Sequence, residues 1–217
     1  MRETPTDAPD APQTGAAGEP VYVYKPSLVG APFEFRLTST ALEWSRGHHV
    51  NRIPYGAIRR LRLSFRPVTM QSHRFLAEVW PAANSKVQIC STSWRSIVEH
   101  ENHDAAYTAF IVELHRRMAA AGTSASFEAG FPSLTYWIGL VCFAGTSLAL
   151  AALTVQALQI GAWAGAATVG GFLALFLWQL GTFFRRNRPG TYRPEAPPAE
   201  VLPQANSEWR VANRVRT

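Results

Sequence analysis

The most constraining feature of this sequence is a long stretch without charged side chains. No Asp, Glu, Lys or Arg occurs between Glu128 and Arg185, a run of 56 residues (129–184), although 17% of the chain is charged. Two apolar segments, 134–156 and 161–184, fill most of it. At about 1.5 Å per residue, a helix over either segment is about 35 Å long, enough for a hydrocarbon core of about 30 Å. The sequence therefore predicts a hairpin of two transmembrane helices.

The alternative is a buried helical hairpin inside a soluble fold. The rest of a 217-residue chain is too small to cover two long helices that are apolar nearly all round. Aromatic residues also stand where a membrane–water interface favours them. They are Tyr136 and Trp137 at the start of the first segment, and Trp178, Phe183 and Phe184 near the end of the second. We therefore favour the membrane interpretation.

Charge next to the hairpin predicts its orientation. Four Arg residues follow the second helix with no acidic residue among them: Arg185, Arg186, Arg188 and Arg193. The turn between the two helices carries no charge. Because positively charged loops stay in the cytoplasm, both termini are expected there. The excess of Arg beside the hairpin also explains the net charge of +6 without nucleic acid as a partner.

The region before the hairpin divides by its residue patterns. Residues 1–20 are rich in Pro, Ala, Thr, Asp and Gly, and are expected to be disordered. Residues 21–91 read as short strands, because apolar and polar side chains alternate in segments such as 33–38 and 59–66. A hairpin is expected over 74–80 and 86–91 around Pro81. These segments favour an antiparallel sheet, sandwich or barrel.

The pattern then changes to that of a helix. Tyr107, Phe110, Ile111, Leu114 and Met118 fall on one stripe of an amphipathic helix, with Asn102 as its expected N-cap and Gly122 as its stop. The fold class is therefore α+β: about seven short strands closed by one helix, then a transmembrane helical hairpin. We expect a cytoplasmic domain over 21–122, a linker over 123–133, the hairpin over 134–184 and a basic, Pro-rich, mostly unfolded tail over 185–217. Docking of the short apolar element 201–203 is the less favoured alternative for the tail.

This arrangement of strands and one closing helix over 33–118 resembles the pleckstrin-homology (PH)-like fold. Residues 53–58 and the strand after them are similar to the middle of bacterial PH-like domains, which often occur beside transmembrane helices. The whole chain also resembles a group of small two-span bacterial membrane proteins with an Arg-Asn-Arg-Pro segment, here 186–189. The resemblance implies a bacterial inner (plasma) membrane protein. It does not imply phosphoinositide binding, because the segment 39–41 is neutral.

Little in the sequence indicates catalysis or a cofactor. Catalytic motifs are absent, and no cofactor is expected. The segment 99–104 is rich in potential metal ligands, but polar residues are usual at a helix entry, so we expect no metal site. Cys90 and Cys142 lie far apart and form no metal-binding or disulfide framework.

Two sets of residues are candidates for contacts. Arg60, Arg62 and Arg66 share one face of a strand and, with Arg185, Arg186 and Arg188, are candidates for contact with anionic lipid or an acidic partner. A solvated outer sheet face is the alternative. The second set consists of small residues that let helices approach closely: Gly145, Ala149, Gly161, Gly165, Thr168 and Gly171. They favour packing of the hairpin on itself or, alternatively, dimerisation.

We therefore expect a non-catalytic inner-membrane protein that presents a membrane-tethered PH-like interaction or regulatory module. Its expected partners are the lipid bilayer and a protein or a second copy bound through the helices. The alternative is a small subunit of a membrane transport or envelope assembly complex, in which the helix pair is the working part. An enzyme within the sheet domain is a third, less favoured interpretation.

Overall fold

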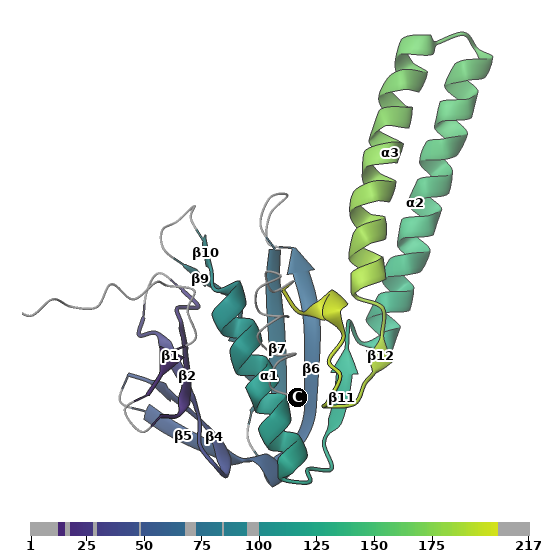
Figure 1. Ribbon diagram of the computed structural model, residues 1–217. Coiled ribbons are helices and arrows are strands. Elements are labelled where there is room, and N and C mark those ends of the chain that lie inside the picture. Colours follow the sequence, from purple (N-terminus) through teal and green to yellow (C-terminus); the bar gives the residue numbers. More distant parts are fainter. Residues whose placement is uncertain are drawn as a thin grey trace, which may run out of the picture. The chain divides into compact units, whose positions relative to one another are not determined.

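The computed structural model describes residues 13–15, 18–27, 30–47, 49–67, 73–83, 85–94 and 100–203 (Figure 1). It divides the chain into two compact units. One unit, the sheet domain, combines residues up to Ala129 with residues from Thr191 onwards. The other, the helical hairpin, is Gly130–Gly190. The hairpin is therefore inserted into the sequence of the sheet domain.

The first sheet of the sheet domain is antiparallel. It contains β1 (Gln13–Thr14), β2 (Pro20–Tyr24), β3 (Phe33–Leu37), β4 (Ala41–Arg46) and β5 (His49–Pro54), in that spatial order. Alternation sets its two faces, because Phe35 and Leu37 are fully buried while Glu34 and Arg36 face outward. Strand β1 lies in the segment 1–20, which the sequence predicts to be disordered, and it pairs with β2. Residues 1–12, 16 and 17 lie outside the described part.

A second sheet follows a 3₁₀ turn, η1 (Tyr55–Ala57). It contains β6 (Ile58–Pro67), β7 (His73–Pro81), β8 (Val87–Cys90), β11 (Ser126–Ala129) and β12 (Gly190–Thr191), in the order β12-β11-β6-β7-β8. The predicted hairpin around Pro81 is confirmed as β7 and β8. Two further strands, β9 (Thr92–Trp94) and β10 (His100–Asn102), pair with each other. The Tyr22 hydroxyl donates to the Cys90 carbonyl at 2.6 Å and so joins the two sheets.

Helix α1 (Asp104–Ala120) confirms the predicted amphipathic helix. All five residues of the predicted stripe are buried, and the Phe110 ring lies 5.6 Å from the Tyr22 ring of β2. His103 stands at the N-cap, one residue after the expected Asn102, and its side chain makes no capping hydrogen bond. The helix stops at Gly122, whose φ of 60° is left-handed and favours glycine.

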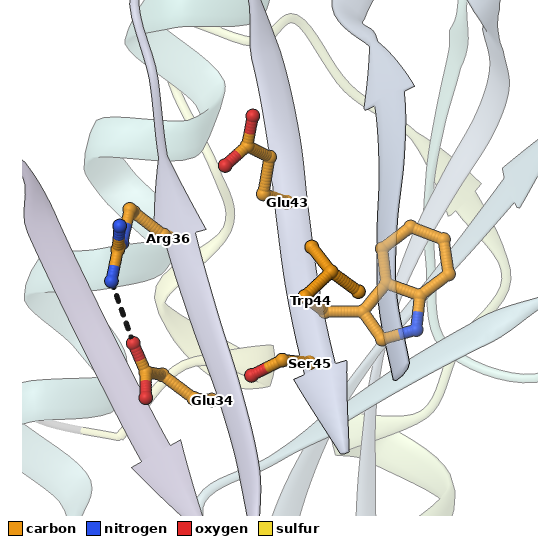
Figure 2. Close-up of a pocket in the computed structure, with 6 residues that line it drawn as sticks. Glu34, Arg36, Glu43, Trp44 and Ser45 are labelled. Carbon is orange, nitrogen blue, oxygen red and sulfur yellow. Dashed lines mark hydrogen bonds and ion pairs between the residues drawn. The ribbon is translucent and has the colours of Figure 1, made fainter. Parts of the chain in front are cut away.

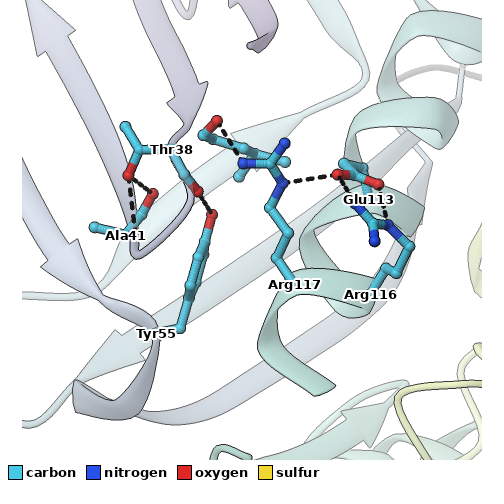
Figure 3. A network of polar contacts seen from close by, with 7 residues as sticks. Thr38, Ala41, Tyr55, Glu113, Arg116 and Arg117 are labelled. Atoms are coloured by element: carbon cyan, nitrogen blue, oxygen red, sulfur yellow. Dashed lines mark hydrogen bonds and ion pairs between the residues drawn. The ribbon is translucent and has the colours of Figure 1, made fainter. Parts of the chain in front are cut away.

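A polar network fixes the last turns of α1 to the first sheet (Figure 3). Arg117 donates from Nη1 to the Leu37 carbonyl at 2.9 Å and from Nε to Glu113 at 2.7 Å. The Tyr55 hydroxyl donates to the Thr38 carbonyl at 2.8 Å. The hydrogen bond from Arg116 lowers the pKa of Glu113 and outweighs burial, which acts in the opposite direction. The helix is thus held by directional bonds as well as by its apolar stripe.

The expected linker after α1 is partly a strand. Ser126–Ala129 forms β11, which runs parallel to β6 with Phe127 opposite Leu61 and Glu128 opposite Arg62. Phe127 is buried, and Glu128 forms ion pairs with β6. Both interactions stabilise the extended conformation of this segment. The sequence of these four residues alone does not predict a strand.

The tail after the hairpin is also more ordered than its composition suggests. The 3₁₀ turn η2 (Ala199–Val201) lies against β6, and Val201 and Leu202 are 1% and 7% exposed. The backbone N–H of Tyr192 donates to the Phe127 carbonyl at 3.1 Å. The prediction of a loose tail is therefore wrong for the described residues 191–203, because burying their apolar side chains offsets the entropy of ordering them.

The second unit is a hairpin of α2 (Ser133–Gln159) and α3 (Trp163–Arg186), which run side by side (Figure 1). Their mean hydropathies are 2.1 and 1.5, and both are long enough to cross a membrane. The turn between them contains Gly161, with a left-handed φ of 73°. The hairpin's base is tight, because a Cβ at Gly130 would clash with the Asn187 and Arg188 carbonyl groups.

Candidate interaction surface

The three Arg residues predicted on one face of β6 lie together with residues from three other segments. We call this the Arg–Trp face. It consists of Arg60, Arg62 and Arg66 of β6, Glu78 and Trp80 of β7, Lys86 and Gln88 of the β8 side, and Glu128 of β11. The strand register brings them together, since Arg60 pairs with Trp80 and Arg62 with Glu78.

Glu128 joins two of the Arg residues through its two carboxylate oxygens. Oε2 accepts from Arg62 Nε at 3.0 Å, while Oε1 lies 3.3 Å from Arg60 Nε. The side chain of Arg62 is only 12% exposed, whereas that of Arg60 is 45% exposed. Arg62 is therefore a buried support of the face, and Arg60 is the guanidinium that solvent and ligands can reach.

Trp80 lies at the centre of the cations. The Arg60 and Arg62 guanidinium carbons are 5.5 and 5.2 Å from the centroid of its ring, and Lys86 Nζ is 5.9 Å away. Cations within about 6 Å of an indole are attracted to its negative π face. The ring therefore holds three positive charges close to one another in spite of their mutual repulsion.

Glu78 neutralises the other end of the face. It is 4% exposed, and accepts from Lys86 Nζ at 2.9 Å and from Gln88 Nε2 at 3.0 Å, with Arg66 at 4.0 Å. Burial raises its pKa, but these hydrogen bonds and nearby charges outweigh burial and hold the pKa below its usual value. Four cations thus meet two carboxylates, which leaves an excess of two positive charges (4 − 2).

The Arg residues after the second helix border the base of the hairpin. Arg185 and Arg186 are the last residues of α3, and Arg185 and Arg188 are exposed. Between them Asn187 is fully buried, and its carbonyl accepts from the Phe131 N–H at 3.1 Å. Gly130 and Asn187 could not be singled out from the sequence. Their close backbone approach joins two segments that lie 57 residues apart (187 − 130).

Packing of the hairpin on itself does not use the predicted small residues. Half-buried residues recur at spacings of three and four along α2: Tyr136, Leu140, Phe143, Ser147, Leu150, Thr154 and Ala157. The ring of Phe143 lies 5.3 Å from those of Phe176 and Phe184. By contrast, no atom lies within 4 Å of a Cβ built at Gly145 or Gly171, and Ala149 and Thr168 are exposed. Gly161 belongs to the turn, and Gly165 meets only Ala162, at 4.0 Å.

Substituting glycines on the two sides of the hairpin should separate these roles. A Cβ at Gly139 lies 3.3 Å from the Phe184 ring, so Gly139→Leu is expected to weaken the hairpin by about 1–3 kcal/mol. Gly145→Leu is the matched control and should leave the hairpin intact. A Cβ at Gly170 lies 3.5 Å from the Thr154 methyl group, so disulfide formation between cysteines placed at these two positions would report helix pairing in membranes. Equal disulfide yields for both variants would contradict this assignment of the interface.

Two other parts of the sheet domain are less suited to recognition. A shallow cavity of about 100 Å³ on the first sheet is lined by Glu34, Arg36, Glu43, Trp44, Ser45 and Val50 (Figure 2). Its charges are paired internally, since Arg36 bonds Glu34 at 3.0 Å and Arg52 lies 3.5 Å from Glu43. The described residues contain no cluster of three metal-ligating side chains; Glu99 of the segment 99–104 lies outside them.

A buried histidine joins the segments on either side of the hairpin. His115 Nδ1 donates to the Ile111 carbonyl at 2.7 Å, and Nε2 accepts from the Tyr192 hydroxyl at 2.9 Å. The Phe127 ring lies 5.5 Å from the imidazole. Burial lowers the pKa of His115 from 6.5 to about 4, because the charged form is poorly solvated there. Nothing in the sequence links His115 to Tyr192, which lies 77 residues away.

This histidine predicts a pH dependence of stability. Between pH 6.5 and 4 the unfolded chain binds a proton at His115 that the folded chain does not, so the free energy of unfolding falls as the pH falls. From pH 7.5 to 5 the loss should be about 2 kcal/mol. His115→Gln should remove this loss, as measured by pulse proteolysis in urea at both pH values. A variant as acid-sensitive as the parent chain would contradict the prediction.

Comparison of this chain with protein families, with curated proteins and with solved structures gives no match in any of the three.

Proposed function

We propose that this chain is a non-catalytic, two-span inner-membrane protein that tethers a PH-like interaction or regulatory module to the cytoplasmic side. Four paired strands (β2 to β5) and three more (β6 to β8) precede α1 in the chain, with only the short pair β9 and β10 between β8 and α1, which supports the PH-like assignment. The exposed cations and the indole of the Arg–Trp face are groups typical of recognition.

The main support for a tethered module is the discontinuous sheet domain. Phe127 precedes the hairpin and Tyr192 follows it, yet the two residues share a backbone hydrogen bond of 3.1 Å and a ring contact at 5.9 Å. A hairpin that crosses the membrane twice must therefore begin and end on the side where the sheet domain folds. The domain holds both ends of its anchor, which restricts its motion relative to the membrane surface more than a single connection would.

The cytoplasmic orientation rests on the Arg residues in the last turn of α3 and just after it. Moving each of them across the membrane would oppose the membrane potential by about 2.3 kcal/mol per 100 mV. Single cysteines at Glu195 and Gln159, in a chain lacking Cys90 and Cys142, test this orientation. An impermeant maleimide added to spheroplasts should label position 159 and spare position 195. The reverse labelling would place the sheet domain outside the cytoplasm.

Site-specific photo-crosslinking tests whether the sheet domain is the working part. A photoreactive amino acid replaces exposed Gln88 on the Arg–Trp face or exposed Gly145 in α2. Adducts from position 88 should persist when α2 and α3 are exchanged for an unrelated hairpin, and should diminish in Arg60→Glu. Loss of the same adducts upon hairpin exchange would contradict a module whose anchor is passive.

A second candidate function is a small subunit of a membrane transport or envelope assembly complex. The exposed small residues of each helix favour it, because such residues let another helix approach closely; they are Gly145 and Ala149 of α2, and Thr168 and Gly171 of α3. Defined adducts from position 145 that disappear upon hairpin exchange would support this function. A homodimeric adduct from the same position would indicate association between copies of this chain.

A further inference from the structure

We infer that the Arg–Trp face docks onto anionic lipid headgroups of the membrane that holds the hairpin, and that Glu128 occupies the place of a headgroup phosphate. This inference rests on the proposed function, because it requires the hairpin to be inserted. It narrows the ligand of the face to one chemical class, the phosphodiester of an anionic lipid.

The first support for this inference is the pair of contacts that Glu128 makes. Its two oxygens each meet one guanidinium, at 3.0 Å for Arg62 Nε and 3.3 Å for Arg60 Nε. A phosphodiester also has one negative charge and two non-bridging oxygens, and guanidinium groups bind phosphate and carboxylate in the same planar geometry. The face is therefore already arranged around one internal anion of the kind that a headgroup would supply.

The accessible cations carry the second step. Arg60, Arg66 and Lys86 have side chains that are 45%, 42% and 49% exposed. Arg60 and Lys86 lie beside Trp80, Arg66 lies beside Glu78, and the residues of the face together carry a net excess of two positive charges. Anionic leaflets attract such residues, and Trp favours the interface because its ring is apolar and its N–H is polar. The Arg52–Glu43 pair on the first sheet has no such excess, since one cation there meets one anion at 3.5 Å.

The length of the connecting chain carries the third step. Glu128 lies on the face itself, and α2 begins at Ser133, five residues later (133 − 128). Five residues span at most about 18 Å, so covalent connection alone keeps Glu128 within that distance of the first residue of α2. A tethered surface meets lipid at a high effective concentration, whereas an acidic protein has to be captured from solution. These observations favour lipid over an acidic protein segment.

Fluorescence quenching in nanodiscs tests the inference with the full chain. A bimane label is attached to Ser85→Cys, beside Lys86, in a chain lacking Cys90 and Cys142. A fraction of the lipids carry a headgroup nitroxide, which quenches bimane only at short range. Nanodiscs contain phosphatidylcholine with increasing phosphatidylglycerol at 0.15 M salt. We expect quenching to rise with phosphatidylglycerol and to be largely lost at 1 M salt, where charges are screened within about 3 Å.

Matched variants identify the residues responsible. Arg60→Gln with Lys86→Gln should raise the phosphatidylglycerol content needed for half-maximal quenching by at least fivefold. Glu128→Gln releases the guanidinium groups and should lower that content by about fivefold. Arg36→Gln with Arg52→Gln, and Glu43→Gln alone, change the net charge by the same amounts on the first sheet and should have little effect. Because Arg60, Lys86, Arg52 and Glu43 all lie at the surface or are half-exposed, these variants should remain folded.

Three results would overturn the inference. They are equal quenching in purely zwitterionic nanodiscs, weaker quenching in Glu128→Gln, and effects of the control pair as large as those of the Arg–Trp face. Protection of position 85 from maleimide in native membranes but not in anionic nanodiscs would assign the face to an acidic protein instead. Reversed labelling of positions 159 and 195 would refute the proposed cytoplasmic orientation. The lipid contact would still be decided separately by the quenching result.

Discussion

Replacing Leu114 with Asp is expected to unfold the sheet domain while the hairpin remains in the membrane. Leu114 is fully buried on the packing stripe of α1. The substitution removes a large apolar side chain and buries a carboxylate without a cation to pair with it. A loss of at least about 4 kcal/mol is comparable with the lower end of the 5–15 kcal/mol that stabilises a typical domain. Pulse proteolysis in urea, with the full chain in detergent, would measure it.

Ala105→Asp is the control for this prediction. Ala105 is exposed on the same helix, near its positive end, where a carboxylate is tolerated or weakly stabilising. Its urea midpoint should match that of the parent chain. If Leu114→Asp showed the parent's midpoint as well, the placement of α1 against the sheets would be wrong.

Ending the chain at Gly190 should destabilise the sheet domain almost as strongly. The truncation removes the buried Val201 and Leu202, each worth about 1.5–3 kcal/mol, and leaves His115 Nε2 without the Tyr192 hydroxyl. The expected total is about 4–6 kcal/mol. The fragment 21–122, which the sequence suggests as an independent domain, lacks Phe127 in addition and should not fold stably.

A chain without its hairpin provides the control for the truncation. Joining Ala129 to Thr191 through a short Gly/Ser linker keeps every described residue of the sheet domain, and the Tyr192–Phe127 hydrogen bond shows that the two ends lie close together. This protein should be soluble and should unfold cooperatively, with mixed helix and sheet by circular dichroism. A truncated chain as stable as this control would show that the tail contributes nothing.

The local sequence pattern was sufficient to predict the strands and the helix that bury one face. The alternation in 59–66 and the stripe from Tyr107 to Met118 both predict the observed structure, because β6 and α1 each pack one side against the core. Strand β11 was missed because four residues are too few to show a period, and its parallel pairing with β6 places its partner 66 residues away. Docking of the tail was only the less favoured alternative, because its prolines suggest an extended chain, although two apolar residues suffice to anchor it.

Only the Arg residues of the Arg–Trp face could be predicted from the sequence. The shared orientation of Arg60, Arg62 and Arg66 follows from the period of a strand, but their partners depend on the pairing of strands. Glu128 and Trp80 come from segments that the sequence alone does not place beside β6. In the hairpin, small residues suggested an interface, while the observed packing uses the rings of Phe143, Phe176 and Phe184.

The insertion of the hairpin within the sheet domain also determines the timing of synthesis. The ribosome completes β6, α1 and β11 first, and must then add about 74 residues (203 − 129) before the last described part of the domain exists. At 5–20 residues per second this delay is roughly 4 to 15 s. Throughout it the place of Tyr192 beside His115 stays unfilled. In the proposed two-span topology, only a chain whose two spans have both inserted correctly delivers the missing residues to the right compartment, so folding of this domain would report that membrane insertion has succeeded.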